Sequence, residues 1–220
     1  MKHHLLQADP EQEVLWFKRR DTLKAAAAWL ALGSLPAAMA QQRSNIVELI
    51  GQIHLNGQQL QPEQTVQTGD QIQTAPNSSL IFVVGDAAFQ VRQNSVLTLE
   101  RGHSLTSVSQ LRLFKGAVLS VWGTDSSCKI IMPTVSAGFR GAGIYAEASG
   151  KNLQRSYLCN CYGKVALSAG KDRTVSTDTH QAFWATSDIS EDISLMPADS
   201  LNHSDEEVAF LASLLGLKPS

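Results

Sequence analysis

The chain has 220 residues, of which 43% are hydrophobic and 17% charged, and its formal net charge is −2. This length accommodates one domain with a substantial core, or one domain and a tail, and the composition excludes a collagen-like or a disordered chain. The small net charge gives no electrostatic reason to expect a nucleic-acid partner.

Residues 1–40 have the composition of an export signal. Basic side chains precede an apolar stretch over residues 25–35, and Ala38 and Ala40 close it as a small-residue A-x-A cleavage site. The stretch is shorter than the about 20 residues that a transmembrane helix needs. We therefore expect cleavage before Gln41 and contact with the membrane only during export. An uncleaved anchor is the alternative.

Two adjacent arginines in this segment indicate the export route. Arg19 and Arg20 resemble the twin-arginine motif of bacterial signals, although Thr22 stands where that motif usually has a large apolar residue. That route carries proteins that have already folded in the cytoplasm. We therefore expect a periplasmic protein whose cysteines meet a reducing compartment first and an oxidising one afterwards.

Residues 45–169 read as an all-β domain of short strands and hairpins, arranged as a solenoid or a sandwich. Apolar or alternating runs are separated by turn-forming pairs, as in LIFVV-GD-AAFQVR around Gly85 and Asp86. Period-two alternation is typical of strands that bury one face. It predicts one β core containing Phe82, Val84, Phe89, Val91, Leu97, Leu113, Val118, Val121 and Ile144.

Residues 170–220 differ in composition from the preceding domain. The part up to residue 203 is polar and is expected to be irregular. Ser204 as N-cap and Glu207 three residues later form a capping box at the start of a helix, and Gly216 is expected to end it. The helix should pack on the β core through one apolar face, made of Val208, Leu211, Leu214 and Leu215.

Two of the three cysteines, Cys159 and Cys161, lie one residue apart in a predicted strand. Residues two apart in a strand project to the same face. Both thiols therefore point to the expected core side, where cysteine serves as a small apolar residue. A disulfide between Cys128 and one of the pair is a second possibility. A bridge within the pair is disfavoured, because Cα atoms so spaced lie about 6.5–7 Å apart, at the limit of disulfide geometry.

A metal site is the third possibility for the cysteine pair. Two thiolates on one face can bind one ion, and zinc or another soft metal ion favours sulfur combined with imidazole. His180 and His203 are the candidate additional ligands, because the segment that carries them must fold back over the β core for the helix to pack. Their spacing matches no standard zinc finger. Core packing, the disulfide and the metal site therefore stay open as alternatives.

The sequence contains none of the common catalytic motifs. There is no G-x-S-x-G elbow, no H-E-x-x-H pair, no phosphate-binding glycine loop and no dinucleotide fingerprint. We therefore expect a non-catalytic protein.

Several segments, in their order along residues 46–168, resemble the FecR domain, a periplasmic module first met in iron-dicitrate signalling. GDQIQTAPNSSLIFVVGD is similar to that family's opening, QNSVLTL to its asparagine-serine turn and LFKGAVLSV to its glycine-centred hairpin. AGFRGAGIYAE is similar to the family's late R-G-T-x-F-x-V motif, with Ala142 in place of the usual threonine.

The resemblance implies an exported binding or sensing module with a protein partner in the periplasm or the cell envelope. Iron-signalling members of that family carry a cytoplasmic domain for a sigma factor, and only 18 residues precede Arg19, so we expect that domain to be absent. A periplasmic metal-binding protein that uses Cys159, Cys161 and His180 or His203 is the alternative function. A structural module of the envelope is a further one.

Overall fold

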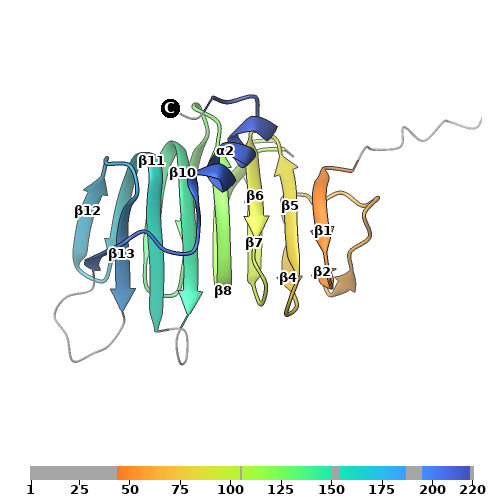
Figure 1. Cartoon of the computed structure of the whole chain (residues 1–220), viewed down its shortest axis with the longest axis horizontal. Coiled ribbons are helices and arrows are strands. Elements are labelled where there is room, and N and C mark those ends of the chain that lie inside the picture. Colours follow the sequence, from red (N-terminus) through yellow and green to blue (C-terminus); the bar gives the residue numbers. More distant parts are fainter. Residues whose placement is uncertain (1–43, 105, 150–153, 187–194, 219–220) are drawn as a thin grey trace, which may run out of the picture. The chain divides into compact units, whose positions relative to one another are not determined.

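The computed structural model describes residues 44–104, 106–149, 154–186 and 195–218. Within these residues a β domain carries one helix, α2, over one of its faces (Figure 1). This confirms the predicted all-β class with a C-terminal helix. The predicted export signal, with Arg19, Arg20, Ala38 and Ala40, lies outside the described residues.

The strands and the helix are β1 (Ile46–Ile50), β2 (Ile53–Leu55), β3 (Gln58–Gln59), β4 (Gln71–Thr74), β5 (Ser79–Val84), β6 (Ala87–Val91), β7 (Val96–Arg101), β8 (Val108–Trp122), β9 (Ser127–Ile131), β10 (Ser136–Ser149), β11 (Arg155–Ala169), β12 (Asp172–Ser176), β13 (Gln181–Thr186), β14 (Leu195–Ala198) and α2 (Asp205–Leu214). No helix in the described part of the chain has the length and apolar character that crossing a membrane requires.

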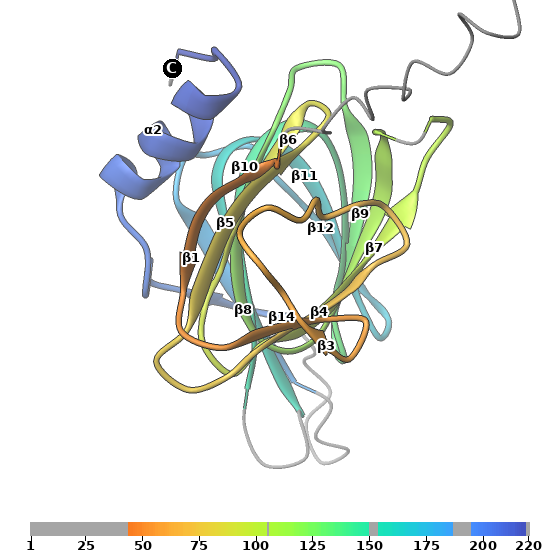
Figure 2. The same cartoon turned by 90° about the vertical axis from the view of Figure 1, so that its right-hand side faces the viewer.

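The strands form two layers because the long strands β8, β10 and β11 each take part in both. The second half of β8 pairs with β6 and β10, and its first half pairs with β7 and β9. The front layer of Figure 1 therefore runs β1-β5-β6-β8-β10-β11-β13-β14, and the back layer runs β3-β2-β4-β7-β8-β9-β10-β11-β12. Figure 2 shows the two layers on either side of a shared interior.

Two glycines let β10 and β11 pass from one layer to the other. Gly141 and Gly163 have φ of +56° and +98°, backbone values that residues with a Cβ rarely adopt. The pairing register of the two strands shifts beside them, between Arg140 and Ile144, as at a β-bulge. Period-two alternation alone predicts one continuous face from residue 157 to residue 167. That prediction is wrong, because alternate side chains change face across Gly163: Cys159 and Cys161 lie in one apolar cluster, and Val165 and Leu167 in the other.

The apolar side chains form two clusters on opposite faces of the front layer. The interior core lies between the layers. In it, Phe82 stacks on Phe89 with ring centroids 5.0 Å apart, and Phe89 meets Trp122 edge-to-face at 5.1 Å. The outer core lies on the other face, beneath α2. All nine predicted core residues are buried; Val121 belongs to the outer core and the other eight to the interior core.

Helix α2 begins and ends as its sequence predicts. The Ser204 side chain accepts from the N–H of Glu207, whose carboxylate accepts from the N–H of Ser204, which is the capping box. Gly216 follows the C-cap with φ of +69°. Val208, Leu211 and Ala212 are buried against the outer core.

Residues 170–186 and 195–203 contain three strands, whereas their polar composition predicts an irregular segment. Strand β12 pairs with the second half of β11, β13 pairs with its first half, and β14 pairs with β13. This segment thus extends both layers, and it leads the chain across the outer face of the sheet to α2.

Candidate metal centre

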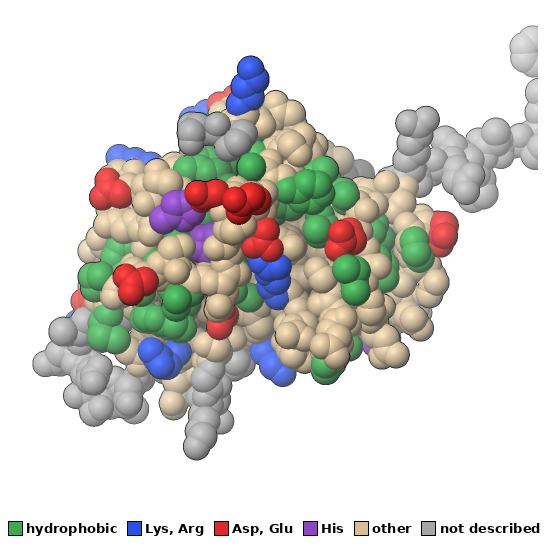
Figure 3. Space-filling view, in the orientation of Figure 1, with side chains coloured by type: hydrophobic (Ala, Val, Ile, Leu, Met, Phe, Trp, Pro, Cys, Tyr) green, Lys and Arg blue, Asp and Glu red, His purple; other side chains and the backbone are tan. Residues whose placement is uncertain are grey.

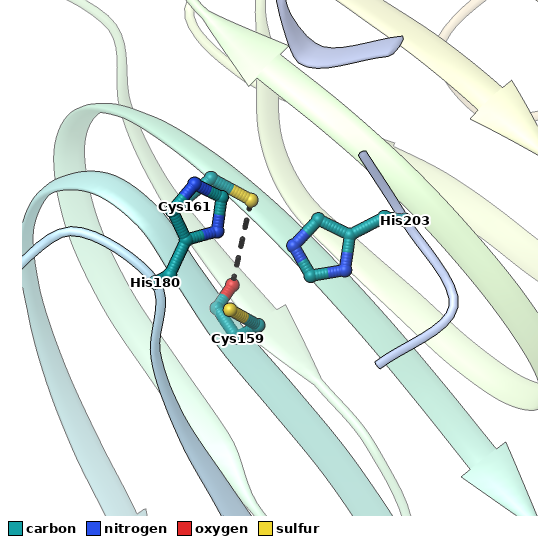
Figure 4. Close-up of side chains that lie close together, drawn as sticks. All are labelled: Cys159, Cys161, His180 and His203. Carbon is teal, nitrogen blue, oxygen red and sulfur yellow. Dashed lines mark hydrogen bonds between the residues drawn. The ribbon is translucent and has the colours of Figure 1, made fainter. Parts of the chain in front are cut away.

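The outer core contains a cluster of two cysteines and two histidines. Cys159 and Cys161 lie on β11, His180 lies in the turn before β13, and His203 lies just before α2. One ligand atom from each residue lies within 4.8 Å of all the others, and Figure 4 shows both imidazole rings directed at the cysteines. The structure therefore brings together all four residues that the sequence indicates. We call them the Cys2His2 cluster.

The first half of β11 presents both thiols to the outer core. Pairing with β10 on one side and β13 on the other keeps this stretch extended, so the alternate residues Tyr157, Cys159 and Cys161 share a face. Cys159 and Cys161 are 0% and 2% exposed. The Cys161 thiol also donates a weak hydrogen bond to the carbonyl of Cys159, at 4.0 Å. The two thiols are thus buried, adjacent and held by a paired strand.

His180 enters the cluster from a strained turn. Its φ of +56° lies in the left-handed region, which is uncommon for residues other than glycine. Its Nε2 lies 2.6 Å from Oδ1 of Asp205, the first residue of α2. Its Nδ1 is buried and makes no hydrogen bond within the described part of the chain. One ring nitrogen is therefore fixed by a carboxylate while the other faces the thiols.

His203 has the complementary arrangement. Its Nδ1 lies 2.7 Å from the carbonyl oxygen of Leu201, and its Nε2 is buried without a hydrogen-bond partner among the described residues. The ring stacks on Tyr145, with centroids 4.9 Å apart and planes 11° apart. The stacking and the Nδ1 contact fix the orientation of this ring and leave Nε2 facing the cluster.

The four side chains shift one another's protonation. A hydrogen bond from Cys161 lowers the pKa of Cys159, burial opposes it, and the nearby His203 and His180 lower it further. Cys161 keeps its proton, because that hydrogen bond and burial raise the pKa of its thiol. Burial lowers the pKa of His203, but contact with Cys159 and with the Leu201 carbonyl raises it by more. The cluster thus favours the thiolate form of Cys159 over that of Cys161.

The donor set and its spacing fit zinc. A tetrahedral zinc ion with bonds of about 2.3 Å to sulfur and about 2.1 Å to nitrogen separates its ligand atoms by about 3.3–3.8 Å. The four ligand atoms all lie within 4.8 Å of one another, so each pair needs to close by about 1.5 Å at most to reach that spacing. Two thiolates also neutralise a divalent ion, so a buried site of this composition carries no net charge.

Cys128 lies apart from the Cys2His2 cluster, and this corrects the disulfide alternative. It sits on β9 in the back layer, where its side chain belongs to the interior core. All three cysteines are free. Burial raises the pKa of the Cys128 thiol to about 12. A bridge from Cys128 to Cys159 or Cys161 would have to cross from the interior core to the outer core.

Asp205 contacts the Cys2His2 cluster, and the sequence analysis does not predict this contact. The run HSDEE predicts only the capping box of Ser204 and Glu207. Figure 3 shows histidine and acidic side chains side by side on this face, and Asp205 forms the ion pair with His180. Asp205 and His180 are far apart in the sequence, so no local pattern indicates that they are in contact.

Comparisons with known proteins bear on the fold. No protein-family model matches the chain, and no curated protein matches it. Two crystal structures, each of a putative anti-sigma factor from Parabacteroides distasonis, resemble it with TM-scores of 0.50 and 0.51 and sequence identities of 9% and 10%. The matches cover 61% and 64% of this chain and equal shares of those chains, so this chain spans less than two thirds of their length. Identity this low shows a shared fold and no more.

Proposed function

We propose that the protein is a non-catalytic, metal-binding sensor module that holds one zinc ion between Cys159, Cys161, His180 and His203. One observation carries the proposal. Two buried imidazole nitrogens, which have no hydrogen-bond partner among the described residues, face a pair of buried thiols, while the opposite nitrogen of each ring is held by an oxygen. Histidines that bind metal ions show this pattern, because the outer oxygen fixes the tautomer and the ring orientation.

Core packing of the cysteines does not account for the histidines. If the cysteines only filled space in the outer core, small apolar residues would fill the same volume. Packing of that kind does not require two imidazoles beside the thiols. A buried polar nitrogen left without a partner destabilises the folded state by about 1–3 kcal/mol, and native structures contain few such groups. The metal site explains both nitrogens and both thiols together.

The closed donor set favours a structural or sensing role over catalysis. Catalytic zinc sites keep one position open for water or substrate, whereas structural sites use four protein ligands. All four ligands here come from the chain, and both thiols are buried. Sulfur and imidazole in tetrahedral arrangement select zinc over magnesium or calcium, which prefer oxygen ligands.

The sensing role is supported by the fold. The two structures that share it are of putative anti-sigma factors, a class of regulatory proteins that act through protein partners. The FecR-like segments and the export signal in the sequence agree with a regulatory module that works in the periplasm through a protein of the envelope. A metal site in such a module would let the binding of a metal ion change its interaction with the partner protein.

Elemental analysis of the purified full chain tests the proposal. We expect a single zinc ion per chain, and we expect Cys161→Ser combined with His203→Ala to abolish it. Two matched controls replace the same residue types elsewhere: Cys128→Ser in the interior core and His103→Ala on the surface. Both should retain the ion. A wild-type chain that binds no metal after exposure to zinc would refute the proposal.

A further inference from the structure

The segment that carries His203 lies across the outer face of the front layer. Residues 199–204, here called the strap, connect β14 to α2 (Figure 1). The Tyr157 hydroxyl donates to the carbonyl of Asp199 at 2.7 Å and accepts from the N–H of Leu201 at 2.9 Å. The Asn202 side chain donates to the Glu147 carboxylate at 2.9 Å. The strap is thus attached to the sheet by a few hydrogen bonds and by the stacking of His203 on Tyr145.

Helix α2 depends on this attachment. It has ten residues, fewer than the about 12–15 that an isolated helix needs to be stable in water. It buries Val208, Leu211 and Ala212. Two polar contacts of its first turn also reach the rest of the chain: Asp205 with His180, and Glu207 with Arg92, whose side chains are 31% and 27% exposed. Exposed pairs of this kind contribute little to stability.

His203 is the one member of the Cys2His2 cluster that lies on the strap. Cys159 and Cys161 lie within β11, and His180 directly precedes β13, so three of the four belong to the paired sheet. Lifting the strap would remove His203 from a bound ion. It would also remove Asp205, which orients His180. An ion bound with the strap lifted would therefore keep at most three ligands.

Building on the proposed zinc site, we infer that zinc fastens the strap and helix α2 to the sheet, so that metal occupancy controls whether α2 covers the outer core. A ligand shifts a conformational equilibrium by its difference in affinity for the two states. Here the difference comes from His203 and Asp205. The coupling is reciprocal: zinc favours the seated helix by the same factor by which the seated helix favours zinc.

Hydrogen exchange of the full chain, with zinc and with a chelator, tests the first half of this relation. We expect the amides of 208–214 to exchange about 5-fold or more faster without zinc, while those of 117–121 in β8 stay protected. His203→Ala should give the fast rate in both conditions. Rates that do not depend on zinc, or loss of protection in β8 as well as α2, would overturn the fastening.

Zinc affinity of Leu211→Ala tests the second half. Leu211 is a fully buried side chain of α2 and is not a ligand. Its truncation should weaken zinc binding about 5-fold or more only if seating of the helix favours zinc. Phe210→Ala is the matched control, because Phe210 lies on the same helix and is 45% exposed. Equal affinities would refute the fastening and leave the zinc site standing, whereas a wild type that binds no zinc would refute the site itself.

Discussion

Nε2 of His180 lies 2.6 Å from Oδ1 of Asp205, so the first residue of α2 orients a ring whose other nitrogen faces two thiols. Asp205→Asn keeps the shape of that side chain and removes its charge. Loss of an outer partner of a metal ligand weakens metal binding by about 10–100-fold. We expect a loss of that size in the zinc affinity, measured by competition with a chromophoric chelator.

The neighbouring Glu206 provides the control for Asp205→Asn. Glu206→Gln removes one negative charge from the same helical turn, and Glu206 is exposed and is not a member of the Cys2His2 cluster. Zinc affinity should stay at the wild-type value in this variant. If both variants lose affinity equally, the effect comes from the charge of the first turn and His180 is not oriented by Asp205.

Cobalt substitution reports the donor set directly. Co²⁺ bound by two thiolates and two imidazoles in tetrahedral geometry should give a thiolate-to-cobalt charge-transfer band and intense visible d–d bands. Cys161→Ser should weaken the charge-transfer band, because one of the two sulfur donors is lost. Cys128→Ser should leave the spectrum unchanged, since that thiol lies in the interior core. A wild-type spectrum typical of octahedral cobalt would contradict the site.

Local patterns in the sequence were sufficient for some features. The capping box of Ser204 and Glu207 and the end of the helix near Gly216 depend on contacts within a few residues, and both are confirmed. The members of the Cys2His2 cluster could be named because cysteine and histidine are the ligand types of soft metal ions. Their convergence could be anticipated because the helix has to fold back over the sheet.

Other features depend on contacts between distant segments. The face switch at Gly163 depends on its approach to Gly141, 22 residues earlier, where a Cβ on Gly163 would lie 2.7 Å from the Gly141 carbonyl oxygen. Strand β12 was missed because its apolar residue Val175 is exposed and Ser176 is buried, so hydrophobicity along the strand does not follow burial. The ion pair of His180 with Asp205 joins a turn to a helix and has no local signature.

The interior core should be sensitive to the loss of one ring. Phe89 is fully buried and contacts the rings of Phe82 and Trp122. Phe89→Ala should lower the free energy of unfolding by about 3–5 kcal/mol, measured by chemical denaturation. Phe114→Ala, which removes a 41% exposed ring from β8, should change it by less than about 0.5 kcal/mol. Similar losses in the two variants would contradict the assigned core.

The export route gives a prediction in cells. Replacing Arg19 and Arg20 together by lysine should leave the precursor in the cytoplasm, because the paired arginines are the element by which the twin-arginine route is expected to accept this chain. Fractionation followed by immunoblotting measures the distribution. An unchanged periplasmic yield would reject the twin-arginine route and leave export by another route in place.

Gly163→Ala tests the layer switch on which the position of the thiols depends. Gly163 has φ of +98°, and an added Cβ would meet the carbonyl oxygen of Gly141 at 2.7 Å and the Cβ of Ala142 at 3.0 Å. Strain of this kind costs about 1–3 kcal/mol, which should appear as a lower free energy of unfolding in chemical denaturation. Gly138→Ala is the matched control, because Gly138 lies on β10 in extended backbone with no atom within 4 Å of an added Cβ. That variant should be as stable as the wild type or more stable, since alanine restricts the unfolded chain. Equal stabilities of the two variants would show that the switch does not require glycine at residue 163.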